Sequence, residues 1–430
     1  MENAYTIRLD RFSSELKWLF FELYPWNGDA YAGLLSVMEA QYKLRGRTLL
    51  KRDNLLVNNP EWYKRASMQE KFVEGAYKME TLGLSGDFND PQVFLKTVEE
   101  MLSLNNTGAD LLRLKGIPGI FVMDGGWQNI QKAHNAVRIL RMVNDIVSPG
   151  VLLLGELNGG LGDISAFFGR YEKPELHLVE DHLFRPALWQ TTATHDVRLL
   201  GNEIAKAAQM PKHYVFLRTV DPKEGFAWNL DRTFLQDLGL NPEIHIRYLQ
   251  DYFTDSRKNP LKGKAIPDTQ GVPGISGSMQ DLTGITKAQK KGDVAAVRTG
   301  VQKSELLLAL LMMQSGIPCI PMGEIPEEEG LYGTSARTLL RKLFRFRREH
   351  HVFDADADVW TVQTDNDAVI GIGRYKEGEK IYGLFNFSDE EQVFCLRDPG
   401  EYENLVSGKV SRIVSLVRLQ PYAYGWLVRK

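Results

Sequence analysis

Strand-like and helix-like segments alternate along residues 85–345. Short apolar runs such as "GADLLRL" (108–114) and "GVLLLGEL" (150–157) are typical of buried strands, whereas longer segments with apolar residues every three or four positions indicate helices. A strand, a helix and a second strand in succession predict a βα unit with parallel strands. The pattern therefore predicts an α/β fold for the central part of the chain.

Further segments continue this alternation. The segment 90–104 opens with Asp90 as a helix N-cap and Pro91 at the first helical position. Residues 213–221 and 317–324 have the composition of strands. Helices are expected at 129–147, 193–209 and 304–316.

The two ends of the chain have different patterns. Apolar residues from Phe12 to Leu23 recur on one helical stripe, and "PWNGD" (25–29) separates this helix from the next. From about residue 350, short β-rich segments alternate with turn formers, which predicts an antiparallel β-domain. We expect a helical N-terminal domain at 1–80, a partial (β/α) barrel at 81–349 with a loop-rich insertion at 229–285, and a C-terminal β-sandwich at 350–430.

Composition excludes some classes of partner. The formal net charge is −3, so no global field favours nucleic acid or an anionic membrane. The basic run "RKLFRFRREHH" (341–351) carries Leu343, Phe344 and Phe346 at helical spacing, which favours an amphipathic helix over a binding patch. No apolar run approaches the roughly 20 residues of a membrane span. Two cysteines and no visible secretory signal lead us to expect a cytoplasmic protein.

Several motifs together resemble the α-amylase superfamily of glycoside hydrolases and, within it, the amylosucrases. The resemblance covers most of residues 9–430. The motifs that carry it are "NPEWYKRASM" (59–68), "FNDPQVFLKTVEEMLSLNNTGADLLRLKGIPGIF" (88–121), "GWQNIQKAHNAVRILRMV" (126–143), "PGVLLLGEL" (149–157), "HLFRPALWQTTATHDVRLL" (182–200), "FLRTVDPKEGFAWN" (216–229), "GIPCIPMGE" (316–324), "LFNFSDEEQ" (384–392) and "LQPYAYGWL" (419–427).

This resemblance implies an incomplete barrel. Such enzymes place three βα units and a large loop domain before the fourth barrel strand, but here residue 80 leads almost directly into "SGDFNDPQVF" (85–94). Only the last five strands of a (β/α)₈ barrel are matched. An incomplete barrel has open strand edges, so we expect residues 70–85, the helical domain or a second chain to cover the fourth-strand side.

The resemblance also implies site residues. It places the nucleophile at position 115, the general acid/base at Glu156 and a transition-state-stabilising carboxylate at Asp221, each at the carboxyl end of a predicted strand. Arg113, two residues before position 115, lies on the same strand face and helps to orient the nucleophile in the family, and we expect it to bind substrate.

Position 115, however, is Lys115. A protonated lysine is not a nucleophile, repels an oxocarbenium-like transition state and favours the ionised form of a neighbouring Glu156, which makes that residue a poor proton donor. We therefore expect Lys115 within ion-pair range of Glu156 or Asp221. The residue before Asp221 is Val220 in place of the family's His, and the donor-binding motifs of the second and third strands have no counterpart.

Other interpretations of these residues stay open. Glu156 can be a surface residue at a strand end, and Asp221 before Pro222 can belong to a turn. Trp127 and Trp228 lie near strand ends, where they can stack on sugar rings or be buried in the core. His177 and His182 are the nearest approach to metal ligands, but without a third ligand nearby they predict no metal site, and no cofactor motif rises above a weak signal.

These observations favour a carbohydrate-related, catalytically inactive protein with residual glucoside or sucrose binding or an interaction role, as a monomer or homo-oligomer. One alternative is an active retaining hydrolase or glucosyltransferase with an atypical site. Another is a structural protein that pairs through its open barrel edge. Turnover of sucrose or α-glucan distinguishes the first alternative, and ligand-induced stabilisation distinguishes a binding protein from a structural one.

Overall fold

The computed structural model describes residues 2–45, 77–121, 130–157, 159–170, 172–254, 261–266, 272–321, 324–325, 330–362 and 365–430. The chain divides into two compact units, Met1–Glu180 and Asp181–Lys430. The division falls inside the segment 81–349 that we expected to form one partial barrel, and the expected boundary at residue 80 lies within a strand. The three-domain scheme stays a prediction.

The first unit begins with two helices and continues as βα units. Its elements are α1 (Glu2–Leu23), α2 (Gly28–Leu44), β1 (Met79–Gly83), α6 (Pro91–Asn106), β2 (Leu111–Lys115), a 3₁₀ turn η2 (Ile117–Gly119), α7 (Ile130–Val147), β3 (Leu152–Glu156), α8 (Leu161–Ala166), the hairpin β4 (Gly169–Arg170) and β5 (Lys173–Pro174), and β6 (Leu178–Glu180). Asp90 caps α6 by accepting a hydrogen bond from the Gln92 amide at 2.9 Å, and Pro91 opens the helix, as predicted.

The sheet of the first unit is parallel, and a segment from residues 70–85 covers its fourth-strand side. Strand β1 pairs with β2, with Met79 opposite Leu111, and β2 pairs with β3, which in turn pairs with β6. The prediction that residues 70–85 supply a covering strand is therefore confirmed for 79–83. Gly116 makes the turn after β2 with φ of 87°, where a Cβ would lie 2.9 Å from the Leu84 carbonyl oxygen.

Helices of the first unit pack on one another through aromatic side chains. Phe20 of α1 contacts Tyr24, Tyr31 of α2 and Phe94 of α6, with ring centroids 5.0–6.4 Å apart. Arg8 of α1 is buried and donates from Nε to the Ile146 carbonyl at 2.6 Å. The described N-terminal helices are thus part of the same compact unit as the βα elements.

The second unit combines further βα elements with an antiparallel β-domain. Its first elements are α9 (Phe184–Thr194), α10 (Arg198–Ala208), β7 (Phe216–Thr219), β8 (Phe226–Ala227), α11 (Arg232–Asp237), α12 (Pro242–Thr254), β9 (Lys264–Ile266), β10 (Gly274–Ser276), α13 (Met279–Leu282), α14 (Ile285–Lys291), α15 (Val294–Met313), β11 (Ile317–Cys319), α16 (Leu331–Glu349) and η3 (His351–Phe353). Strands β7 and β11 pair in parallel, with Leu217 opposite Ile317.

The expected loop-rich insertion at 229–285 carries more regular structure than its composition predicted. It contains α11, α12 and α13, and its strands β9 and β10 form a small sheet with β8. The reason is the amphipathic pattern of α12, which buries His245, Ile246, Leu249 and Phe253 on one face. The sequence analysis did not predict this helix, because the high content of Gly, Pro and Asp elsewhere in the segment indicated loops.

The C-terminal β-domain is antiparallel, as predicted. Its strands are β12 (Asp358–Val362), β13 (Val369–Lys376), β14 (Glu379–Asn386), β15 (Gln392–Cys395), β16 (Gly400–Asn404), β17 (Lys409–Ile413), β18 (Leu416–Leu419) and β19 (Tyr424–Arg429). Six strands form one sheet in the order β12-β13-β14-β19-β16-β17, and β15 and β18 form a second. Phe394 and Leu419 of the small sheet pack with Tyr382 and Leu384 of the large one. The chain is therefore an α/β protein of incomplete (β/α)₈-barrel type with a C-terminal β-sandwich.

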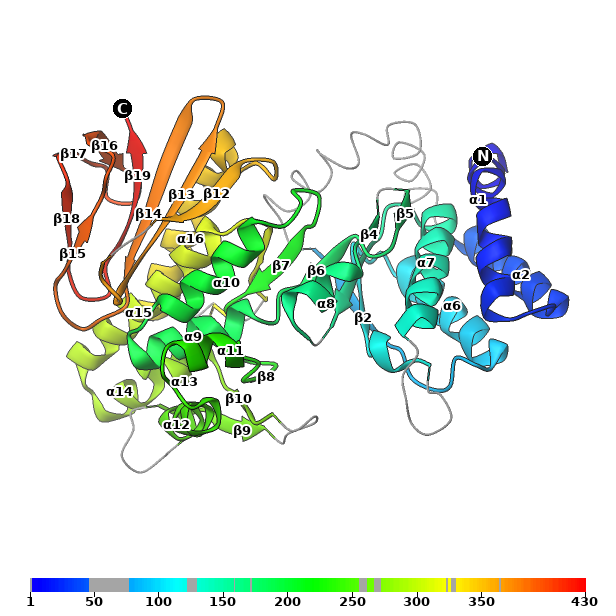
Figure 1. Ribbon diagram of the computed structural model, residues 1–430, viewed down its shortest axis with the longest axis horizontal. Helices are drawn as coiled ribbons and strands as arrows, with labels where there is room; N and C mark the ends of the chain where they lie inside the picture. Colours follow the sequence, from blue (N-terminus) through cyan, green and yellow to red (C-terminus); the bar gives the residue numbers. More distant parts are fainter. Residues whose placement is uncertain are drawn as a thin grey trace. The chain divides into compact units, whose positions relative to one another are not determined.

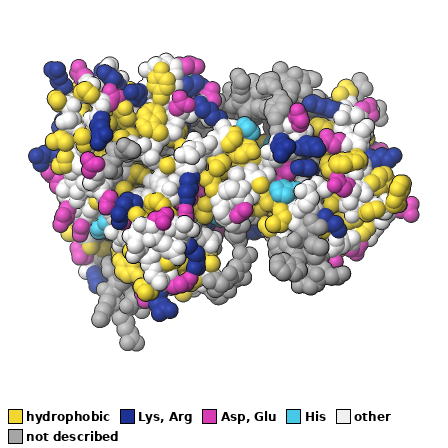
Figure 2. All heavy atoms as spheres, in the orientation of Figure 1, with side chains coloured by type: hydrophobic (Ala, Val, Ile, Leu, Met, Phe, Trp, Pro, Cys, Tyr) yellow, Lys and Arg dark blue, Asp and Glu magenta, His cyan; other side chains and the backbone are white. Residues whose placement is uncertain are grey.

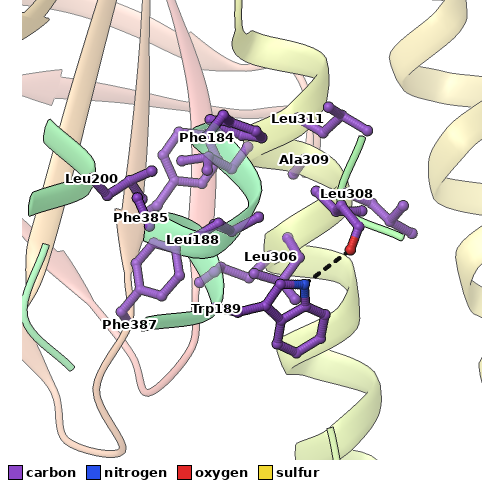
Figure 3. Packing of buried hydrophobic residues seen from close by; sticks show 14 of the residues in the cluster. Phe184, Leu188, Trp189, Leu200, Leu306, Leu308, Ala309, Leu311, Phe385 and Phe387 are labelled. Atoms are coloured by element: carbon purple, nitrogen blue, oxygen red, sulfur yellow. Dashed lines mark hydrogen bonds between the residues drawn. The ribbon is translucent and has the colours of Figure 1, made fainter. Parts of the chain in front are cut away.

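The main core of the second unit lies between its helices and the large antiparallel sheet. Figure 1 shows α15 and α16 beside the C-terminal strands. Figure 3 shows Phe184, Leu188 and Trp189 of α9 packed with apolar side chains of α15 and with Phe385 and Phe387. The basic run 341–351 lies mainly on α16, with Leu343 and Phe346 buried, so its prediction as an amphipathic helix is confirmed.

Two buried arginines, Arg374 and Arg218, and the half-buried Arg347 surround the carboxyl end of α15. Arg374 donates to the Met313 carbonyl at 3.1 Å, Arg347 donates to the Met312 carbonyl at 2.5 Å, and Arg218 donates to the Ser315 carbonyl at 2.7 Å. The last carbonyls of a helix have no partner within the helix, and its dipole favours cations there. The three guanidinium groups therefore donate hydrogen bonds to backbone carbonyls at the end of α15 and just after it, where the neighbouring side chains are otherwise apolar.

The surface carries charges of both signs. On the face drawn in Figure 2, lysine and arginine side chains lie among acidic and hydrophobic ones. Within the described residues, no helix has the length and apolar character that a membrane span requires.

Candidate functional site

The first part of the candidate site lies at the carboxyl ends of β2, β3 and β6. Lys115 is the last residue of β2 and stands opposite Glu156, the last residue of β3, in the parallel register. Glu180 is the last residue of β6. Residues two apart on a strand share a face, which places Arg113 on the same side as Lys115. Local strand geometry thus brings two cations and two carboxylates together.

Distances within this cluster fall in the ion-pair range. The Glu156 Oε2 atom lies 3.1 Å from Lys115 Nζ and 2.9 Å from Arg113 Nε. Arg113 Nη2 donates to Glu180 Oε2 at 2.7 Å. The prediction that the Lys115 ammonium lies within ion-pair range of Glu156 is therefore confirmed.

Burial separates the cluster into an inner and an outer pair. The side chains of Arg113 and Glu180 are 7% and 5% exposed, whereas those of Glu156 and Lys115 are 27% and 42% exposed. Both cations contact the Glu156 Oε2 atom, so the Glu156 side chain is held between Lys115 and Arg113.

Glu180 was not predicted as a site residue. It is 67 residues from Arg113 along the chain, and its position at the end of "HLVE" (177–180) was the one local signal that could have placed it at a strand end. The buried bond between Arg113 and Glu180 means that the Arg113 side chain is already committed to protein partners. Its expected role in substrate binding therefore stays a prediction.

A separate candidate cluster lies in the second unit and contains Asp221. This residue follows β7 and is 4% exposed. Its Oδ1 atom accepts a hydrogen bond from the Lys223 amide at 2.9 Å, and Arg185 donates to its carbonyl at 3.0 Å. The indole of Trp189 donates to the Val220 carbonyl at 3.1 Å, which is the dashed line in Figure 3. These bonds fix the backbone on either side of Asp221.

Asp221 forms a carboxyl pair with Glu324, a residue that the sequence did not single out. Glu324 lies in the segment after β11, is 5% exposed, and accepts a hydrogen bond from the Met279 amide at 2.8 Å. Burial, and then the negative charge of the nearby Asp221, raise the pKa of Glu324 to about 8. The Glu324 side chain is therefore mainly protonated at neutral pH.

Tyr332 of α16 lies near this pair. Its side chain is 1% exposed, and its hydroxyl has no hydrogen-bond partner among the described residues. Burial is the main cause that raises the pKa of Tyr332, and the nearby Glu324 and Asp221 add to it. The hydroxyl therefore stays protonated beside two acidic groups.

The two tryptophans that we considered for sugar stacking have different outcomes. Trp228 is 1% exposed, donates from its indole to Gln250 of α12 at 3.0 Å and stacks on Phe253 with ring centroids 5.8 Å apart. Trp228 is thus a core residue covered by α12, which agrees with the burial interpretation that the sequence left open, and its sugar-binding role stays a prediction. Trp127 lies outside the described residues.

The histidines that we considered as metal ligands have structural partners. His177 accepts a hydrogen bond at Nδ1 from the Leu153 amide at 2.9 Å and is buried. Within the described parts of the chain, no group of three or more His, Cys, Asp or Glu side chains is placed to hold a metal ion.

Comparisons with known proteins connect this fold to carbohydrate-active enzymes. No family model matches the chain. Among curated proteins, the glucosylglycerate phosphorylase of Escherichia coli K12 is 27% identical over 376 residues, which is 79% of this chain and 64% of that protein. The glucosylglycerate phosphorylase of Allomeiothermus silvanus is 30% identical over 133 residues, which is 31% of this chain and 23% of that protein. The chain spans less than two thirds of the length of both relatives.

Solved structures show the fold. A crystal structure of AmyP in complex with maltose has a TM-score of 0.53 at 12% identity and covers 85% of this chain and 77% of its own. A variant of AmyP in complex with maltotriose has a TM-score of 0.51 at 12% identity, with 86% and 78% covered. The chain therefore has an α-amylase-type fold, and its sequence is weakly similar to glucosylglycerate phosphorylases.

Proposed function

We propose that this chain is a non-catalytic member of the α-amylase-type proteins that retains glucoside binding and carries out no glycosyl transfer. The observation that carries the proposal is the ion pair of 3.1 Å between Lys115 and Glu156, at the two positions where the family's nucleophile and acid/base are expected. A retaining mechanism needs two carboxyl groups about 5–5.5 Å apart in different protonation states. In this chain the positively charged Lys115 stands where one of these two carboxyl groups is expected.

Residual binding is supported by the outer pair of the cluster. Glu156 and Lys115 are partly exposed and can accept and donate hydrogen bonds to sugar hydroxyls. Hydrogen bonds to charged groups contribute about 1.5–3 kcal/mol each, which is enough for weak binding when two or three are made. Sucrose and glucosylglycerate are the ligands to test first, because the resemblance and the curated relatives name them.

We expect a glucoside to raise the midpoint of thermal unfolding. At a ligand concentration ten times Kd the added stability is about 1.4 kcal/mol, which corresponds to a shift of about 2 °C for a chain of this size. The measurement is a thermal scan with sucrose or glucosylglycerate against sorbitol at equal concentration, since polyols stabilise proteins without binding. Glu156→Gln weakens the pair and should reduce the shift.

The thermal shift distinguishes a glucoside-binding role from a structural role. A shift that exceeds the sorbitol control and falls in Glu156→Gln supports binding at the strand ends. Equal shifts for glucoside and sorbitol contradict binding and leave a structural role, for which the edge position of β1 in the parallel sheet is the supporting observation.

A further inference from the structure

A cavity of about 450 Å³ lies on the C-terminal β-domain, within the second unit. Its lining comes from the connection between β12 and β13 (365–367), from Gln392, Val393 and Cys395 of β15, and from Leu416 of β18. Small-molecule sites have volumes of roughly 300–1,000 Å³. This cavity therefore has the size of a small-molecule site, and it contains none of the residues of the two clusters described above.

The floor of the cavity is the outer face of the small sheet, whose strands β15 and β18 lie side by side (Figure 1). Val393 and Cys395 share one face of β15, because side chains alternate along a strand, and Leu416 stands opposite Cys395 in the antiparallel register. Phe394 between them packs in the core of the β-domain. Val393 and Leu416 are 39% and 61% exposed, so they give the cavity an apolar floor.

The side-chain amides of the rim are already committed to protein partners. Asn366 Nδ2 donates to Gln392 Oε1 at 2.8 Å and to the Val393 carbonyl at 3.3 Å, which uses both of its N–H groups. Asn366 Oδ1 accepts from the Ala368 amide at 2.9 Å. Gln392 Nε2 donates to the Ser388 hydroxyl at 3.1 Å, which uses one of its two N–H groups. These bonds hold the rim in one shape and leave it with few free donors.

The carboxylates of the rim are far less engaged. Asp365 is exposed and makes no hydrogen bond or ion pair with the described residues. Asp367 has an ion pair of 3.5 Å with Arg198, whose guanidinium lies closer, at 2.6 Å, to Asp196. No lining residue is cationic. The polar atoms that the cavity offers to a ligand are therefore mostly negatively charged acceptors.

We propose that this cavity binds an aliphatic amine, with the ammonium group at Asp365 and the methylene chain over Val393 and Leu416. An ammonium supplies three N–H donors and no acceptor, which matches free carboxylates beside committed amides. Its hydrogen bonds to a carboxylate are charge-assisted and stronger than those of a neutral hydroxyl. A neutral polyol also has acceptors to satisfy, and the rim has few donors for them. This inference goes beyond the proposed function, which concerns glucosides at the strand ends of the first unit.

The test compares 1,5-diaminopentane with 1,5-pentanediol, which has the same chain length and no charge. We would measure the transverse relaxation of the ligand's methylene protons with the intact protein at pH 7.0, with sodium chloride added to the diol sample to equalise ionic strength. The protein should increase the relaxation rate of the diamine at least three-fold more than that of the diol. Equal increases for the two compounds overturn the proposal.

The matched variants are Asp365→Asn in the cavity and Asp237→Asn on α11, which is exposed and does not line it. Each removes one negative charge, so the pair separates local contact from the overall field of the protein. Asp365→Asn should reduce the protein's effect on the diamine at least three-fold, and Asp237→Asn should leave it unchanged. Equal effects of the two variants would contradict an ammonium site at Asp365.

Cys395 reports where the diamine binds. Methyl methanethiosulfonate modifies thiols and leaves amines intact, and mass spectrometry of tryptic peptides follows Cys395 and Cys319 separately. At 10 mM, the diamine should slow modification of Cys395 at least three-fold, which corresponds to a Kd of about 5 mM or lower. Cys319 lies on β11 outside the cavity, so its rate should not change. Unslowed modification of Cys395, or equal slowing at both cysteines, would contradict binding in this cavity.

Discussion

Replacing Arg374 by Met is expected to lower the free energy of unfolding by about 3 kcal/mol. Arg374 on β13 is 1% exposed and donates to the carbonyls of Val352 at 2.6 Å and of Met313 at 3.1 Å. Methionine fills a similar volume but donates nothing, so both carbonyls stay buried without a partner. Each such group costs about 1–3 kcal/mol.

Repulsion among the neighbouring arginines opposes the loss of stability expected for Arg374→Met. Burial, and then the nearby charges of Arg347 and Arg218, lower the pKa of Arg374. Removing one of three neighbouring cations therefore also relieves repulsion, and exchanging buried charges for apolar groups is sometimes neutral. We expect the carbonyls to decide the outcome, because backbone atoms at a helix end cannot rearrange to find other donors.

The measurement is equilibrium denaturant unfolding of the intact chain. Arg345→Met is the matched control, since Arg345 lies on α16 with a 54% exposed side chain and one distant ion pair of 3.8 Å. It should change the stability by less than about 0.5 kcal/mol. An Arg374→Met variant as stable as the control would contradict the role that we assign to the three arginines.

Stability is also expected to fall as pH rises, and Glu324 is the cause. Its folded-state pKa is raised to about 8, against an ordinary value of 4.5. The folded state therefore holds a proton that the unfolded state releases between these two values, so the contribution is complete below about pH 4.5 and is lost as pH rises through about 8. Allowing for solvent screening, we expect a loss of about 2 kcal/mol from this group.

The variant Glu324→Gln separates this effect from other titrations. An uncharged glutamine can still accept the hydrogen bond from the Met279 amide, but it does not titrate. Denaturant unfolding at pH 5.5 and pH 8.5 should therefore show a smaller decline for the variant than for the wild type. If both proteins lose the same stability between the two pH values, Glu324 does not hold the proton.

The α/β pattern could be predicted because it depends on local signals. Asp90 and Pro91 mark the start of α6, and apolar runs mark β2 and β3. The covering strand β1 was predicted by position, since an open edge beside β2 needs a partner and the preceding residues are the nearest. Periodicity also predicted α16 as one amphipathic helix.

The rest depends on partners that lie far away in the sequence. Glu180 is significant because the parallel register brings it to Arg113. Glu324 is significant because the nearby charge of Asp221 adds to burial in raising its pKa. Trp228 lies near the end of a predicted strand, but it is buried because α12 of the insertion packs against it. Such tertiary contacts produce no recognisable pattern in the sequence around the residues that make them.

We propose that the residues at the strand ends do not transfer a glucosyl group. Lys115→Asp restores a carboxylate at the nucleophile position, yet Val220 and the missing donor-binding motifs are unchanged. Catalytic groups that act as a unit are strongly non-additive, and loss of positioning alone forfeits on the order of 7–11 kcal/mol. We therefore expect that the carboxylate introduced by Lys115→Asp does not by itself restore glycosyl transfer.

The most direct measurement follows glucose and fructose release from sucrose, and glucose phosphate formation from glucosylglycerate with inorganic phosphate. Purified wild type and Lys115→Asp are compared with a blank that carries Lys115→Asp and Glu156→Gln together. We predict that both proteins stay at the rate of the blank. Turnover by either protein well above the blank would contradict the account and establish a working glycosyl-transfer site.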